Sequence, residues 1–136
     1  MASVFVDTNV LVYAFDGADP DKQAVARSVL KGSDVLVLST QVLLEFFVVV
    51  TRKLDPPVPA DLARAAVTEF SKLQVVSADA SLVQRAVEAS ITHHLSVWDA
   101  MIIEAASVAG CATVLTEDLA AGSTIRDVHI VDPFTA

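Results

Sequence analysis

Val4-Phe-Val-Asp-Thr-Asn-Val-Leu-Val-Tyr-Ala-Phe15 is the stretch that decides the fold. A short apolar run ends abruptly at Asp7, and a second apolar segment opens behind Thr8-Asn9. This pattern predicts a buried strand, a polar turn and a short helix, because a brief apolar run bounded by polar residues is typical of a strand covered on both faces. Polar groups directly behind such a strand lie where open parallel sheets bind ligands.

The alternation of strands and helices continues along the chain. Asp19-Pro20 cap a helix that Gly32 closes, and Gly110 follows the last predicted helix. We predict helices at about 20–31, 40–53, 60–73, 81–91 and 97–109, and further strands at 34–38, 74–76, 112–115 and 128–131. Because parallel neighbours need crossover connections, the alternation predicts a three-layer α/β/α fold with a central, mainly parallel sheet of four to five strands.

The length and composition bound the class of protein. The 136 residues, 54% of them hydrophobic, suit a single domain over residues 1–136 with a sizeable core. No apolar run approaches the roughly 18 residues of a membrane span, and the first residues lack the basic segment of a secretory signal. We therefore expect a cytoplasmic protein without a membrane contact. The single cysteine, Cys111, excludes an internal disulfide and is expected to be a small buried side chain.

The formal net charge of −8 argues against broad wrapping of a long nucleic-acid duplex. It does not exclude an enzyme that acts on nucleic acid, because a few cations, backbone N–H groups and a bound metal can also hold phosphate. Part of the acidity could belong to the site itself or to a surface that binds a basic partner.

Four acidic residues, Asp7, Glu45, Asp99 and Asp118, are predicted to meet at one edge of the sheet. Asp7 and Asp118 follow the first and fourth predicted strands, whereas Asp99 and Glu45 lie in the first turns of helices that begin at the same edge. Carboxylates are hard ligands, and several close together repel one another unless a cation or protons compensate. The pattern predicts a site for Mg²⁺ or Mn²⁺ that assists attack on a phosphodiester.

Each acid also has a structural interpretation. Asp7 could cap a helix, Asp99 could form a capping box with Ser96, and Asp118 could stand in an ordinary turn. Glu45 is harder to explain, because its neighbours in 42–50 are all apolar, no cation lies at its i±3 or i±4 positions, and burying an unpaired carboxylate is costly.

Other polar and aromatic side chains are candidates for supporting roles. Asn9 and Thr116 are placed to hydrogen-bond a metal ligand, a bound water or a phosphate, although both residue types are also common in turns and caps. Tyr13 and Trp98 could stack on a nucleobase or serve as packing residues. The sequence leaves these alternatives open.

Several segments together resemble the PIN-domain family, and within it the toxins of the VapC type. The resemblance spans nearly the whole chain, and its motifs are Val4 to Phe15, Gln41-Val-Leu-Leu-Glu-Phe46, Ser96-Val-Trp-Asp-Ala-Met101, Leu115-Thr-Glu-Asp-Leu119 and the closing Val128 to Phe134. The resemblance implies an endoribonuclease that depends on Mg²⁺ or Mn²⁺. It also implies the toxin component of a type II toxin–antitoxin pair, which is usually dimeric and is inhibited by a cognate antitoxin.

The family's site residues carry over to matching positions of this chain. Asp7 and Asp99 match the principal metal-binding aspartates, and Glu45 matches the acidic helix position. Asp118 matches the last acid of a Thr-x-Asp element, and the neighbouring Glu117 is the alternative carboxylate for that position. The resemblance thus implies metal ligands at Asp7, Asp99 and Asp118, with Glu45 as a further catalytic acid and RNA as substrate. Two alternatives stay open: a non-catalytic protein of this fold that binds a metal or a partner, and a phosphatase or phosphotransferase with Asp7 as its nucleophile.

Overall fold

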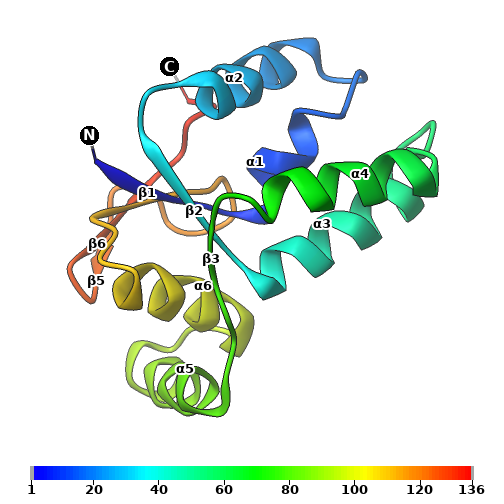
Figure 1. Ribbon diagram of the computed structural model, residues 1–136. Helices are drawn as coiled ribbons and strands as arrows, with labels where there is room; N and C mark the ends of the chain where they lie inside the picture. The colour runs from blue at the N-terminus through cyan, green and yellow to red at the C-terminus, as the bar shows by residue number, and fades with distance from the viewer. Residues whose placement is uncertain (1, 136) are drawn as a thin grey trace.

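The computed structural model describes residues 2–135, which form a six-stranded sheet between two layers of helices (Figure 1). The strands are β1 (Ser3–Val6), β2 (Val35–Ser39), β3 (Gln74–Val76), β4 (Thr113–Leu115), β5 (Thr124–Ile125) and β6 (Val128–Val131), in the order β3-β2-β1-β4-β6-β5. Every neighbouring pair is parallel except β5 and β6. The predicted α/β fold is confirmed. The predicted strand number is slightly too low, because β5 has only two residues and leaves no periodic pattern.

The helices follow the predicted order with small changes at their ends. They are α1 (Thr8–Tyr13), α2 (Pro20–Lys31), α3 (Thr40–Arg52), α4 (Ala60–Phe70), α5 (Ala80–His93) and α6 (Val97–Val108). Connections from β1 to β2 and from β2 to β3 step in one direction across the sheet, and the connection from β3 to β4 returns. Crossovers of one hand therefore place α1–α4 on one face and α5 and α6 on the other, as Figure 1 shows.

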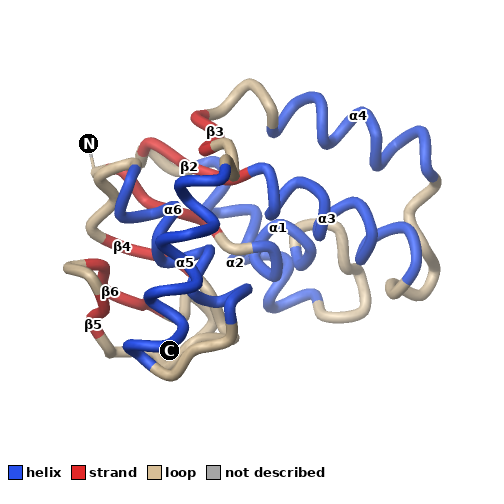
Figure 2. Tube along the Cα trace, turned by 90° about the horizontal axis from the view of Figure 1, so that it is seen from below, coloured by secondary structure: helices blue, strands red, loops and turns tan. Residues whose placement is uncertain are grey.

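The α3–α4 pair extends beyond the strands (Figure 2), whereas α6 packs against the sheet and α5 packs against α6. The buried core is built from β1, β2, β4 and β6, the short α1, one face of each of α2–α5, and α6, which is buried on all sides along residues 100–106. In the part of the chain that the structure describes, no helix has the length and apolar character of a membrane span. Cys111 is buried as expected, and burial raises the pKa of its thiol.

One buried acid belongs to the scaffold. Glu104 in α6 is only 1% exposed, and both of its carboxylate oxygens accept hydrogen bonds from the Arg126 guanidinium at 3.0 Å. A buried carboxylate is tolerated when it is paired in this way. The pair holds the turn between β5 and β6 against α6.

Strand order reverses between β1 and β4, which lie side by side at the centre of the sheet. Pairing continues just past the strands, because Asp7 donates its backbone N–H to the Leu115 carbonyl at 3.0 Å and Thr116 donates to the Val131 carbonyl at 3.0 Å. Open α/β sheets bind ligands outside the carboxyl ends of the strands at such a reversal. Asp7 and the 116–118 segment lie at that place.

Candidate active site

Asp7 is the buried centre of a polar network at the end of β1. Its side chain is 8% exposed, and each carboxylate oxygen accepts a hydrogen bond. The Thr8 backbone N–H donates to Oδ1 at 2.7 Å, and the Thr116 hydroxyl donates to Oδ2 at 2.8 Å. The first contact caps α1, so Asp7 is the helix cap that the structural interpretation expects. The second contact joins residues 109 positions apart in sequence, which a local cap does not require.

Asn9 and Thr116 connect Asp7 to Asp118. The Asn9 amide donates to the Thr116 hydroxyl at 3.1 Å and to Asp118 Oδ2 at 2.9 Å, and the Asp118 backbone N–H donates to the Thr116 hydroxyl at 3.1 Å. Thr116 is fully buried, Asn9 is half-buried and Asp118 is exposed. The network therefore leads from the buried Asp7 carboxylate to the exposed Asp118 carboxylate. Asn9 and Thr116, whose predicted role is to support the acids, both form hydrogen bonds within it.

The Glu117 carboxylate is bound outside this network, whereas the Glu117 backbone N–H donates to Asn9 Oδ1 at 3.4 Å. The carboxylate accepts a hydrogen bond from the Tyr13 hydroxyl at 2.6 Å and forms an ion pair with Lys22 at 2.8 Å. Lys22 also lies over the rings of Tyr13 and Phe134, at 4.8 Å and 5.5 Å from their centroids. These contacts come from α1, α2 and the C-terminal segment. Asp118 is thus the carboxylate of this pair that joins the Asp7 network, and Tyr13 is a positioning and packing residue.

Burial raises the pKa of Asp7 from its ordinary 3.8 to about 6. The hydrogen bonds from Thr116 and Thr8 oppose this rise, and the charges of Asp118 and Glu45 add to it. Asp118 and Glu45 therefore each lie within electrostatic range of Asp7. The ionised form of Asp7 is incompletely compensated by the protein, and a cation placed between these acids would supply the missing charge.

Glu45 is exposed, so the expectation that its surroundings are buried is wrong. Val42, Phe46 and Val50, spaced four residues apart, are the buried residues of α3, and Leu43 and Val49 pack against the core while partly exposed. The carboxylate accepts a hydrogen bond from the Gln41 amide at 2.5 Å, one helical turn earlier. The cost of burying a charge therefore does not explain Glu45. Its position beside Gln41, at the edge that carries Asp7, is what supports a functional role.

Asp99 lies half-buried in the first turn of α6, where its backbone N–H donates to the Ser96 hydroxyl at 3.1 Å. This is the hydrogen bond that the N-cap Ser96 accepts in the predicted capping box. Asp99 is not among the charges that raise the pKa of Asp7. The structure therefore brings Asp118 and Glu45 within electrostatic range of Asp7, and it places Asp99 in the first turn of α6.

The donor set fits a hydrated hard cation better than a cage of protein ligands. Within residues 2–135, no three His, Cys, Asp or Glu side chains are already grouped closely enough to hold a metal ion. Mg²⁺ keeps several waters and commonly binds proteins through only one or two carboxylates. Among the described residues the buried Thr8 hydroxyl beside Asp7 has no hydrogen-bond partner, and such a group can bind ordered water. The residues present thus fit a hydrated divalent ion held by Asp7 and Asp118.

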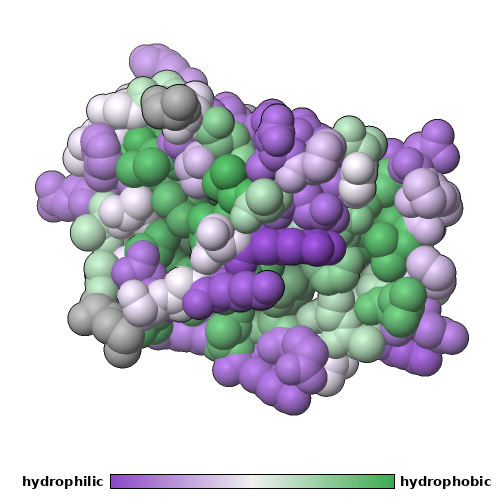
Figure 3. All heavy atoms as spheres, turned by 90° about the horizontal axis from the view of Figure 1, so that it is seen from above, coloured by the Kyte–Doolittle hydropathy of each residue, from purple (hydrophilic) through white to green (hydrophobic). Residues whose placement is uncertain are grey.

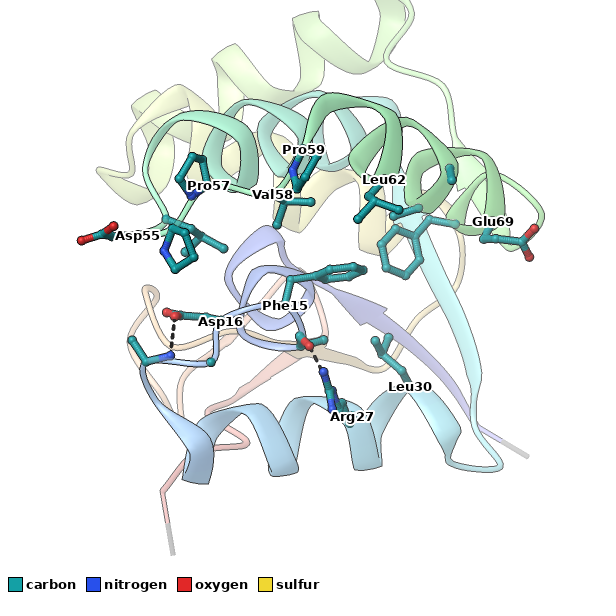
Figure 4. Close-up of a pocket in the computed structure, with 18 of the residues that line it drawn as sticks. Phe15, Asp16, Arg27, Leu30, Asp55, Pro57, Val58, Pro59, Leu62 and Glu69 are labelled. Atoms are coloured by element: carbon teal, nitrogen blue, oxygen red, sulfur yellow. Dashed lines mark hydrogen bonds between the residues drawn. The ribbon is translucent and has the colours of Figure 1, made fainter.

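A concave surface feature lies between α2 and α4. It is an open groove of about 1120 Å³ whose floor includes Phe15, with Leu30 on one side and Leu62 on the other (Figure 4). Phe15 packs edge-on against Phe46 and Phe70, at centroid distances of 5.3 Å and 6.4 Å. Figure 3 views the molecule from the side of α2, where hydrophobic residues are gathered between hydrophilic ones. The sequence pattern gave no signal for this groove.

Comparisons with known proteins agree with this fold. Residues 4–122 match the family model of the PIN domain. Similar solved structures include Mycobacterium tuberculosis VapC20, described as a toxin that cleaves the sarcin-ricin loop, which is 22% identical over 85% of this chain and 91% of that one, with a TM-score of 0.68. A comparison with curated proteins found no match.

Two further similar structures are toxin–antitoxin assemblies. A complex from Klebsiella pneumoniae is 16% identical over 96% of this chain and 97% of that one, with a TM-score of 0.70. DNA-bound VapBC from Salmonella typhimurium is 22% identical over 98% of this chain and 99% of that one, with a TM-score of 0.64. At these identities the likeness concerns the fold.

Proposed function

Because this chain belongs to the PIN-domain family, we propose that it is a metal-dependent endoribonuclease and the toxin of a type II toxin–antitoxin pair. The observation that carries the proposal is the buried Asp7, joined through Thr116 and Asn9 to the exposed Asp118 at the reversal of strand order. A carboxylate that burial makes costly to ionise suits a site that holds a cation. The similar structures support a toxin role within the family.

Asp7 and Asp118 would hold Mg²⁺ or Mn²⁺, with Asp99 as the third ligand that the family resemblance implies. The bound ion would supply an activated water and offset the charge that develops on the phosphate oxygens. Thr116 fixes the Asp7 carboxylate by donating to Oδ2, and Asn9 fixes Asp118 in the same way. Glu45, exposed and hydrogen-bonded to Gln41, is placed to accept a proton or to hold a water.

The substrate we propose is RNA with single-stranded loops. The formal net charge of −8 disfavours binding along a long duplex, and unpaired bases can be splayed on to a compact site. Hydrolysis at a metal site needs only a short length of backbone close to Asp7 and Asp118.

The direct test is cleavage by purified protein freed of any partner. We expect structured RNA to be cut in the presence of Mg²⁺ or Mn²⁺, and cutting to stop when a chelator is added and to return when the ion is restored, as gel analysis of the fragments would show. Cleavage that survives chelation would contradict the metal mechanism. Calorimetric binding of Mg²⁺ with intact RNA throughout would favour the alternative of a non-catalytic metal-binding protein.

The groove between α2 and α4 suits an amphipathic helix of an antitoxin. Helix-in-groove recognition uses apolar anchors spaced along one helix face, and Phe15, Leu30 and Leu62 offer an apolar lining of matching kind. The partner expected is the product of a short adjacent reading frame with a DNA-binding N-terminus and an Arg-containing tail, whose basic side chains would meet the acid site.

The change Leu62→Asp tests this partner site, because Leu62 is 62% exposed on the wall of the groove. We expect it to weaken binding of the co-expressed antitoxin by about ten-fold or more, as measured by calorimetry, while cleavage by the free toxin stays unchanged. Val108→Asp at the end of α6, with a 51% exposed apolar side chain outside this groove, is the matched control for antitoxin binding. Equal affinity for all three proteins would place the antitoxin elsewhere.

We also propose a homodimer in the cytoplasm. Val83, Val87 and Ile91 repeat every fourth residue on α5 and are 43%, 44% and 67% exposed, which is an apolar stripe that a second copy could cover. Sedimentation at working concentration should give twice the monomer mass, and a monomer would contradict this part of the proposal.

A further inference from the structure

A separate cavity is lined by Glu45 and by none of Asp7, Asn9, Thr116 and Asp118. It measures about 750 Å³ and is lined by the first turns of α3 and α6 and by the segment after β3: Thr40, Gln41, Leu44, Glu45, Ala78, Trp98 and Met101. All three segments reach the carboxyl edge of the sheet, and Thr40 ties two of them together by accepting the Ala78 backbone N–H at 3.1 Å. The cavity is thus built from the same sheet edge as the acids.

The lining combines a flat aromatic wall with an apolar floor. Trp98 is 66% exposed and Leu44 is 71% exposed, whereas Met101 is nearly buried. An indole that is two-thirds exposed makes few packing contacts within this chain, which favours the binding alternative for Trp98. Large exposed aromatic side chains next to a site commonly mark binding surfaces.

The cavity also has a polar side. Gln41 lines it, and the Gln41 amide nitrogen donates to Glu45. Among the described residues its carbonyl oxygen is buried without a donor. An aromatic face, a thioether and an unpaired amide acceptor together suit a flat heteroaromatic ring that carries N–H groups on its edge.

We infer that this cavity is a nucleobase subsite in which a base of single-stranded RNA, close to the cleaved bond, stacks on Trp98. The inference rests on the proposed function for the choice of RNA. Continuity with the catalytic edge favours this occupant, because Glu45 lines the cavity and Asp99 follows Trp98 directly in α6. A backbone phosphate at the acids would leave the neighbouring base within reach of the indole. Base stacking would also supply affinity that the acidic surface cannot.

The test uses the fact that Trp98 is the only tryptophan in the chain. Wild-type protein, with Ca²⁺ in place of Mg²⁺ and intact oligonucleotide verified on a gel, is titrated with a single-stranded oligoribonucleotide and with an abasic oligonucleotide of equal length. We expect the base-bearing strand to quench the Trp98 fluorescence in a saturable manner and the abasic strand to leave it unchanged. Equal responses to both strands, or none to either, would overturn the subsite.

Kinetics give a second readout. With any RNA that the protein cleaves, Trp98→Ala should raise KM about ten-fold with a smaller change in kcat, and Trp98→Phe should restore most of the loss. Val108→Ala, at the exposed far end of the same helix, is the matched control and should leave KM unchanged. An unchanged KM in Trp98→Ala would remove the subsite and leave the proposed ribonuclease intact. Fluorescence that changes with protein concentration and not with RNA would instead assign the cavity to a second copy.

Discussion

Replacing Asp7 with Asn should abolish RNA cleavage and also make the metal-free protein more stable at neutral pH. Removing a residue that merely supports a metal ligand commonly costs about 10–100-fold in affinity or activity, so loss of a proposed ligand should cost at least about 100-fold. The gain in stability follows from burial, which makes the ionised Asp7 carboxylate unfavourable in the fold.

The direction of the pH dependence can be worked out from Asp7. Below pH 3.8 its carboxyl is protonated in both the folded and the unfolded chain and costs nothing. Between 3.8 and about 6 the unfolded chain loses this proton while the folded chain keeps it, so the free energy of unfolding falls as pH rises. At about 1.4 kcal/mol for each pH unit, the loss reaches about 3 kcal/mol above pH 6.

The measurement is chemical unfolding in chelator at a series of pH values. Wild-type protein and Asp7→Asn should have similar free energies of unfolding near pH 4, and the variant should gain up to about 3 kcal/mol by pH 7. The observed gain should be below this limit, because an amide nitrogen cannot accept the Thr116 hydrogen bond that Oδ2 accepts. Added Mg²⁺ should stabilise the wild-type protein and leave the variant unchanged.

Asp34→Asn provides the matched control, since Asp34 is exposed and precedes β2 at the opposite edge of the sheet. It makes the same chemical change without relieving a buried charge, and we expect neither the stability gain nor the loss of cleavage. A variant at Asp7 that is less stable than wild type at pH 7 in chelator would contradict the idea that this carboxylate is held at a cost for the sake of the ion.

Much of this site could be predicted from sequence, because the order and direction of the strands determine where the acidic residues lie. Asp7 and Asp118 follow neighbouring parallel strands, so strand alternation alone places them at one edge. Asn9 and Thr116 were singled out as polar residues next to these acids, and the structure gives both of them hydrogen bonds within the network. The match of residues 4–122 to the PIN domain confirms the family that the motifs resemble.

The parts that could not be predicted depend on side-chain contacts between distant segments. The apolar run around Glu45 does not reveal which side chains of α3 face the core, because a helix that carries apolar residues all round has no distinctive face, and Glu45 is exposed. Glu117 is drawn away from the site by Tyr13 and Lys22, a contact across about a hundred residues. The exposure of Trp98 likewise follows from tertiary packing and not from local pattern.

The second large effect concerns Asp99, whose role the family resemblance implies and whose charge is not among those that raise the pKa of Asp7. We expect Asp99→Asn to lower cleavage at least about 100-fold. The melting temperature should hardly change, because the backbone N–H that Ser96 caps is retained and the side chain is only half-buried. Asp79→Asn, a cap of α5 outside the site, is the control that should keep full activity.

A titration with Mg²⁺ separates two ways in which Asp99 could act. If Asp99 binds the ion, the variant should need more Mg²⁺ for half-maximal cleavage, and raising its concentration should recover part of the rate. If Asp99 only orients RNA, the Mg²⁺ dependence should match that of wild type at a uniformly lower rate. Full cleavage by Asp99→Asn would remove this residue from the site and leave Asp7, Asp118 and Glu45 to hold the ion through its waters, because Mg²⁺ needs only one or two protein carboxylates.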